Sequence, residues 1–123
     1  MITNNHECQI VQVDVDTNAF VMTKDFKEVF RISFHNSIIR KFIQTTHGYI
    51  LHFQCRSLVN REKGNVCLIS YDGNISWWAK RKRPEDCYVE LNVTDDSIIG
   101  YDGSYNCYID INTGKIQKRE FVK

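Results

Sequence analysis

The sequence predicts an all-β protein built from antiparallel strands. Segments of about four to eight residues, in which apolar and polar side chains alternate or which are apolar throughout, recur along the chain and are rich in Val, Ile, Tyr, Phe and Thr. Between them stand Asp72-Gly73-Asn74 and Asn112-Thr113-Gly114, whose residue types tolerate a positive φ in tight hairpins. No segment sustains an apolar period of 3.6 residues with helix caps. These three observations favour short strands joined by turns along the whole chain.

The individual strands follow one another with few residues between them. Asp16-Thr17-Asn18 is a poorer form of the hairpin turn. Residues 25–30 and 37–43 could each form one helical turn, but strand is the better interpretation of both. The single proline, Pro84, follows Lys80–Arg83 and marks an exposed connection rather than a domain boundary. In chain order, the expected strands cover residues 8–15, 19–24, 28–34, 38–44, 48–56, 65–71, 74–80, 87–93, 96–101, 105–111 and 115–122.

The second half of the chain repeats itself at an offset of about 40 residues. Val66–Ile75 aligns with Asn106–Ile116 once a difference of one residue in the turn is allowed. The preceding pieces, Thr46–Phe53 and Thr94–Tyr101, match in the same way. The extra residues of the first copy fall in a loop at 56–64, where an insertion has little effect on stability.

A unit of roughly 40 residues with four short antiparallel strands and a hairpin turn at a fixed place is typical of a β-propeller blade. Residues 98–104 (IIGYDGS) and 108–115 (YIDINTGK) resemble the pyrroloquinoline-quinone type of propeller repeat, in which an apolar strand and a D-G precede a strand that ends in an A-x-D-x-x-T-G-K turn. The resemblance implies about two and a half to three propeller-like four-stranded blades in an open partial propeller. The expected units are 8–34, which is partial, 38–80 and 85–123.

A β-sandwich or an irregular barrel is the alternative architecture, because alternating strands with such turns occur in any antiparallel β protein. Closed propellers have four to eight blades, and this chain has residues for about three. An open arc of blades leaves two sheet edges that must be covered, charged or used. A small β protein with an unpaired sheet edge is more typical of a binding module than of an enzyme.

The length and composition of the chain predict one β domain over residues 1–123. Its mass is 14.5 kDa, and 42% of its residues are hydrophobic. Sixteen basic and fifteen acidic side chains give a net charge of +1, so the overall balance favours neither nucleic acid nor an anionic membrane as a partner. The start, MITNNHECQ, lacks the cationic and apolar regions of a secretory signal, and no apolar window has the length of a membrane span. We therefore expect the protein in the cytoplasm.

The cysteines are odd in number, lie far apart and form no C-x-x-C pair. We expect most of them to be free and buried, as small hydrophobic residues. The five are Cys8, Cys55, Cys67, Cys87 and Cys107.

Residues 14–25 imitate a calcium-binding loop only in part. Asp14, Asp16 and Asn18 reproduce its first ligand positions and Asp25 stands at the twelfth. The sixth position, which requires glycine, is Ala19, and no flanking helices are evident. The alternation of a hairpin explains the pattern, so we expect no calcium site.

Other metal, cofactor or catalytic sites are not expected either. His47, His52 and Cys55 are close in sequence, but on a strand residues an odd number apart point to opposite faces. Asp95-Asp96 falls in a predicted tight turn, where acidic residues are common. The sequence contains no G-x-S-x-G, H-E-x-x-H or phosphate-binding loop. We therefore expect no enzyme; a hydrolase assembled around one of the two histidines ranks last among the interpretations.

Trp77-Trp78 followed by Lys80–Arg83 is the arrangement most compatible with nucleic acid, because single strands bind to cationic grooves with aromatic stacking platforms. Glu85-Asp86 and the near-neutral total weaken that field. A small nucleic-acid-binding β protein is thus the alternative function. Adjacent strand residues face opposite sides, so if one tryptophan fills the core, the other is covered by a neighbouring sheet or by a partner.

In its size, expected compartment and strand repetition, the chain resembles the bacterial immunity proteins of toxin–immunity pairs, such as those of contact-dependent growth inhibition. The resemblance implies a protein that binds a cognate toxin, often a nuclease, and blocks its active cleft. Because a nuclease cleft is cationic, the inhibitor would present carboxylates in place of phosphates, with aromatic residues beside them. The repeat would bring the turns that hold these carboxylates, Asp72, Asp95, Asp96 and Asp102, to neighbouring sheet ends. The expected partner-binding residues are Tyr71, Asp72, Trp77, Trp78, Asp95, Asp96, Tyr101, Asp102 and Tyr105.

Overall fold

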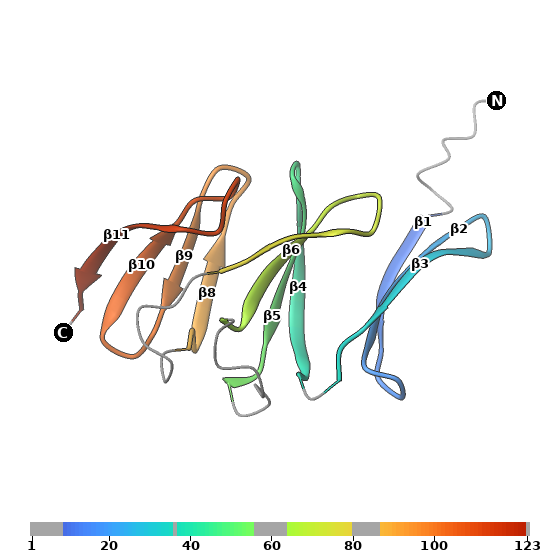
Figure 1. Ribbon diagram of the computed structural model, residues 1–123, viewed down its shortest axis with the longest axis horizontal. Helices are drawn as coiled ribbons and strands as arrows, with labels where there is room; N and C mark the ends of the chain where they lie inside the picture. The colour runs from blue at the N-terminus through green and yellow to red at the C-terminus, as the bar shows by residue number, and fades with distance from the viewer. Residues whose placement is uncertain (1–8, 36, 56–63, 80–86, 123) are drawn as a thin grey trace. The chain divides into compact units, whose positions relative to one another are not determined.

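The computed structural model describes residues 9–35, 37–55, 64–79 and 87–122. Over these residues the protein is all-β, with eleven strands in three sheets, antiparallel pairing throughout and no helix (Figure 1). The predicted class is thereby confirmed. The described part of the chain also contains no helix long and apolar enough to cross a membrane. The chain divides into two compact units, Met1–His35 and Asn36–Lys123.

The first unit is a three-stranded antiparallel sheet with the second strand in the centre. Arg31 joins the last strand to the first turn, because its guanidinium donates to Asp14 and to Thr17, each at 3.1 Å. Residues 25–30 form a tight turn and the start of a strand rather than a helical turn, as the sequence predicted. The strands are β1 (Gln9–Asp14), β2 (Ala19–Lys24) and β3 (Lys27–Ser33).

The second unit contains two four-stranded sheets, each a meander in which every strand pairs with the next strand of the chain. Within each sheet most strands are joined by two to six residues, which are enough to reverse a strand, and only β5 and β6 pair across a longer connection. The first sheet consists of β4 (Ile39–Thr45), β5 (Gly48–Phe53), β6 (Val66–Ile69) and β7 (Ile75–Trp78), and the second of β8 (Glu90–Val93), β9 (Ile98–Tyr101), β10 (Tyr105–Ile109) and β11 (Ile116–Phe121).

The two sheets of the second unit share one hydrophobic core. Alternate residues of a strand supply it, as with Val66 and Leu68 of β6 and Cys107 and Ile109 of β10, because the side chains of a strand have a period of two. Gly100 allows a close approach, because a Cβ at this position would stand 2.4 Å from a ring carbon of Tyr88. The buried members of the core are Ile50, Val66, Leu68, Trp77, Ala79, Tyr88, Leu91, Ile98, Cys107, Ile109 and Ile111.

Cys55 and Cys87 form a disulfide, with their Cα atoms 5.9 Å apart. The prediction of free cysteines is therefore wrong for this pair, which 32 intervening positions separate in sequence and the packing of the two sheets brings together. The prediction is confirmed for Cys67 and Cys107, which are free and buried. Cys8 lies outside the described residues.

Candidate functional site

Turns of both sheets of the second unit lie at the same end of the unit (Figure 1). Because successive strands run in opposite directions, the turns after β4 and β6 share an end of their sheet, and so do the turns after β8 and β10. The main-chain N–H of Thr46 donates to Asp95 Oδ1 at 3.2 Å, which joins these two ends. The exposed residues Tyr71, Asp72, Asp95 and Asp96 lie here, and together we call them the acidic turn end.

Tyr71 is held in place at this end although its side chain faces solvent. Its hydroxyl donates to the carbonyl oxygen of Thr45, and its ring lies edge-on against Tyr49 with the centroids 5.0 Å apart. Even so, 39% of the residue is exposed. An aromatic ring that is already ordered loses little further entropy when a partner covers it.

The acidic turn end is negatively charged. With Asp110 and Lys115 included, these turns carry four carboxylates and one lysine. Hydrogen bonding from the Ser70 hydroxyl lowers the pKa of Asp72 and keeps its carboxylate ionised. Within the described part of the chain, no ion pair neutralises Asp72, Asp95 or Asp96. The arrangement suits a cationic partner.

Tyr101, Asp102 and Tyr105 lie at the opposite end of the second sheet, because they flank the turn after β9. The structure therefore does not bring Asp102 to the other expected aspartates. The Asp102 carboxylate accepts hydrogen bonds from the N–H groups of Ser104 (3.0 Å) and Tyr105 (2.7 Å), and Arg119 lies 3.4 Å away. Burial opposes its charge, but these hydrogen bonds outweigh burial and lower the pKa of Asp102.

The contacts of Asp102 stabilise the turn after β9. The Asp102 side chain is only 8% exposed, and Arg119, its partner, also packs over the Tyr105 ring at 4.0 Å from the centroid. The Tyr101 hydroxyl donates to the carbonyl of Gly103 at 2.9 Å, which closes the same turn. These three expected binding residues thus stabilise a turn of their own sheet.

The two tryptophans have different surroundings. Trp77 is 8% exposed, and its Nε1–H donates to the carbonyl oxygen of Ile111 at 2.8 Å, so it joins β7 to the turn after β10. Gly114 leaves room for this ring, since a Cβ there would stand 2.6 Å from it. Trp78 points to the other face of the sheet, is half-buried and lies against Phe53 with centroids 5.4 Å apart. Lys80–Arg83 lie outside the described residues.

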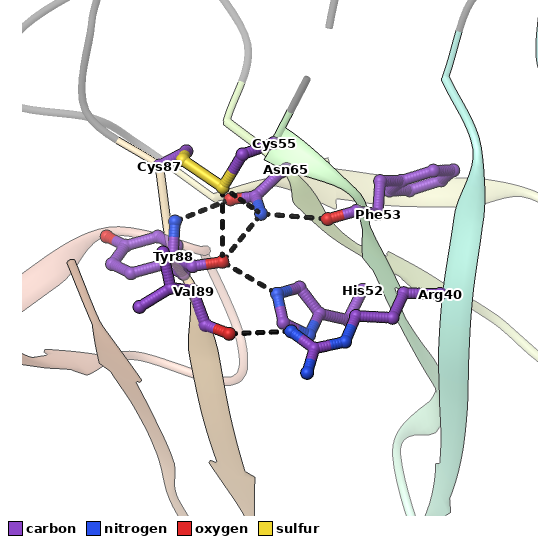
Figure 2. Close-up of a disulfide and its surroundings, with 8 residues drawn as sticks. All are labelled: Arg40, His52, Phe53, Cys55, Asn65, Cys87, Tyr88 and Val89. Carbon is purple, nitrogen blue, oxygen red and sulfur yellow. Dashed lines mark hydrogen bonds between the residues drawn. A yellow bond between two sulfur atoms is a disulfide. The ribbon is translucent and has the colours of Figure 1, made fainter. Parts of the chain in front are cut away.

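A cluster that the sequence did not reveal surrounds the disulfide (Figure 2). The fully buried Asn65 donates through Nδ2 to the carbonyls of Phe53 (2.9 Å) and Tyr88 (2.8 Å), and its Oδ1 accepts from the N–H of Tyr88 at 2.8 Å. His52, 1% exposed, adds a hydrogen bond of 2.7 Å from Nε2 to the same Tyr88 carbonyl. We call this set the Asn65 clamp. It fixes the segment before β8 against the end of β5.

His52 is neutral within this cluster. Burial, and the positive charges of Arg40 and Lys41, lower its pKa, although the bond to the Tyr88 carbonyl acts in the opposite direction. Because Nε2 donates to Tyr88, Nδ1 is the bare acceptor nitrogen. It is buried and has no hydrogen-bond partner among the described residues.

A pocket of about 370 Å³ adjoins the disulfide. Arg40 is exposed at its wall, and its guanidinium donates to the carbonyl oxygen of Val89 at 2.6 Å. The pocket therefore has a cationic group and one cysteine of the disulfide in its wall. Its lining consists of Arg40, Phe53, Gln54, Cys55, Tyr88 and Val89.

The first unit presents a residue that sequence reasoning did not single out. Phe26, at the tip of the β2–β3 hairpin, is 90% exposed and has φ of 65°, while Asp25 before it has φ of 53°. Two successive positive φ values define a turn that prefers Asn-Gly. The signal was available in the sequence, since Asp25-Phe26 separates two alternating segments by only two residues.

Fold and site together define an all-β protein with one three-stranded meander, two packed four-stranded meanders and an acidic group of turns. The chain belongs to a family described as a domain of unknown function, DUF7957, whose family model matches residues 10–121. No curated protein matches the chain. In the described residues, no group of three or more His, Cys, Asp or Glu side chains is placed to hold a metal ion.

Proposed function

We propose that this protein is a binding module that neutralises a cognate protein toxin, most directly a nuclease domain, by covering its cationic cleft. The observation that carries the proposal is the acidic turn end, where Asp72, Asp95 and Asp96 stand beside the exposed ring of Tyr71. Carboxylates on a surface can occupy the positions that phosphates take in a nuclease cleft, and an aromatic residue beside them adds apolar contact area. The proposal assigns no catalytic step and no cofactor to this chain.

The rigidity of the site supports this function. Thr46 joins the turn of Asp95 to the first sheet, and the hydroxyl of Tyr71 joins its turn to Thr45. Interacting groups that are already in place lose less entropy on binding, so more of the interaction energy appears as affinity.

For the architecture, we propose that the two four-stranded meanders are propeller-like blades and that the β1–β3 sheet is a partial one. Sequential strand order within each sheet, and the core shared by the two sheets, are the features that support it.

We propose that the protein acts in the cytoplasm, where an inhibitor would protect the cell that makes it. Disulfides are rare in that compartment because thiol reductants keep cysteines reduced. The Cys55–Cys87 bond would therefore be exposed to exchange there.

Direct binding of nucleic acid receives less support, because Trp77 is buried and its Nε1 is already bonded to Ile111. Salt-sensitive binding to single-stranded oligonucleotides would nevertheless favour that function over the proposed one.

The proposal is tested with the protein encoded by the neighbouring reading frame. The two proteins are purified separately, mixed at equimolar ratio, and assayed for cleavage of RNA and DNA. We expect a stable complex and loss of nuclease activity. A neighbouring nuclease that stays fully active at equimolar ratio would contradict the function.

A further inference from the structure

The Cys55–Cys87 disulfide links the end of β5 to the segment before β8 and therefore connects the two sheets of the second unit. The start of β5 and the end of β8 are at the acidic turn end. The disulfide, which joins the end of β5 to the segment before β8, is therefore at the opposite end of these sheets. Reduction of the disulfide can therefore be measured independently of partner binding at the acidic turn end.

The disulfide borders the pocket beside Arg40. Cys55 and Cys87 are both partly exposed, and Cys55 forms part of the wall of the 370 Å³ pocket. Arg40 stands at the same wall. Its fixed positive charge favours the approach of an anionic molecule, and the attacking species in thiol–disulfide exchange is an anion, the thiolate.

The fold does not depend on this covalent bond alone. The Asn65 clamp holds the main chain of Tyr88, the residue next to Cys87, by three hydrogen bonds: Asn65 Nδ2 and His52 Nε2 donate to its carbonyl, and its N–H donates to Asn65 Oδ1. A fourth bond, from Asn65 Nδ2 to the Phe53 carbonyl, ties the clamp to the end of β5. Cys55 Sγ lies 3.7 Å from the Tyr88 carbonyl oxygen, so a reduced Cys55 thiol already has an acceptor in place. The two sheets can stay packed when the sulfur–sulfur bond is broken.

We propose that Cys55–Cys87 is a thiol-exchange site, at which a small anionic thiol enters the Arg40 pocket and reduces the disulfide in the folded protein. The thiolate sulfur bonds to Cys55 Sγ, the Cys55–Cys87 bond breaks, and the electron pair leaves on Cys87 Sγ, which takes up a proton. A second thiol molecule attacks the mixed disulfide, releases Cys55 and departs as the disulfide of the small thiol. Two thiols are oxidised and one disulfide is reduced.

The first experiment measures reduction in the folded state, with Cys8→Ser as the parent protein. The protein is incubated with glutathione, quenched with iodoacetamide and analysed by peptide mass spectrometry, while circular dichroism follows the fold. We expect alkylation of Cys55 and Cys87 without loss of the β signal, and protection of the buried Cys67 and Cys107. The proposal is overturned if Cys55 and Cys87 alkylate before any reductant is added, or if their reduction is no faster than global unfolding.

The second experiment tests the role of Arg40 by comparing two reductants. We expect Arg40→Gln to slow reduction by glutathione, whose attacking thiolate form carries two net negative charges, by about two- to fivefold relative to dithiothreitol, whose attacking thiolate carries one. Arg40→Lys keeps the charge and should restore the wild-type ratio. Because both rates come from the same variant, a general loosening of the fold cancels in the ratio. An unchanged ratio in Arg40→Gln would exclude attack through this pocket.

Discussion

At the scale of single residues, His52 couples stability to pH. Its folded pKa is lowered, chiefly by burial, so between its ordinary value of about 6.5 and its folded value the unfolded chain binds more protons than the folded one. The stability that His52 contributes is therefore fully present above pH ~6.5 and declines as the pH falls below it.

We expect the free energy of unfolding of the wild type to decrease between pH 7 and pH 5, with a slope from His52 of at most about 1.4 kcal/mol per pH unit. His52→Gln keeps an N–H that can reach the Tyr88 carbonyl but does not titrate, so its slope should be smaller. Urea unfolding at several pH values measures both. Equal slopes in the two proteins would show that His52 is not a buried neutral histidine.

Phe26 carries backbone strain at an exposed position. A non-glycine residue at φ of 65° costs about 1 kcal/mol, and a ring that is 90% exposed returns little of it through packing. Phe26→Gly and Phe26→Asn should therefore raise the free energy of unfolding by about 0.5 kcal/mol, measured by thermal or urea unfolding. A loss of stability in both variants would contradict this description of the turn.

At the scale of strands and turns, the Asn65 clamp joins elements that the chain separates. Asn65→Ala removes three hydrogen bonds and leaves the buried N–H of Tyr88 without an acceptor, so we expect it to lower the free energy of unfolding by about 3 kcal/mol. Asn92→Ala, an exposed asparagine on β8, is the matched control and should change stability by less than about 0.5 kcal/mol. Urea unfolding measures the free energy of unfolding of both variants, with the Cys55–Cys87 disulfide formed and with it reduced. A loss below about 1 kcal/mol for Asn65→Ala would mean that the clamp is not a main support of the sheet contact.

The strands and turns could be predicted because their signals are local. The alternation in Lys27–Ser33, for example, and the glycine turns at Gly73 and Gly114 are each contained within a few residues. The disulfide could not be predicted in the same way, since pairing of Cys55 with Cys87 depends on how the two sheets pack. The prediction that Asp102 lies with the other aspartates did not take the direction of the strands into account. Asp95 precedes β9 and Asp102 follows it, so their turns lie at opposite ends of that strand.

At the scale of the whole molecule, a net charge of +1 conceals a local excess of negative charge. The acidic turn end places Asp72 at the same end as the neighbouring pair Asp95-Asp96, which is far from it in the linear sequence. The overall charge therefore says little about the partner, whereas the topology of the second unit indicates which surface would contact it.

The central claim is that this acidic surface binds the partner, and the most direct test is the dissociation constant of the complex with the neighbouring gene product. The triple variant Asp72→Asn, Asp95→Asn, Asp96→Asn is compared with Asp16→Asn, Glu90→Gln, Glu120→Gln, which removes the same charge from exposed positions elsewhere. By isothermal titration or surface plasmon resonance, we predict that the first variant binds at least about a hundredfold more weakly and with a reduced salt dependence, while the second binds within about threefold of wild type. Equal affinities for the two triple variants would contradict the claim.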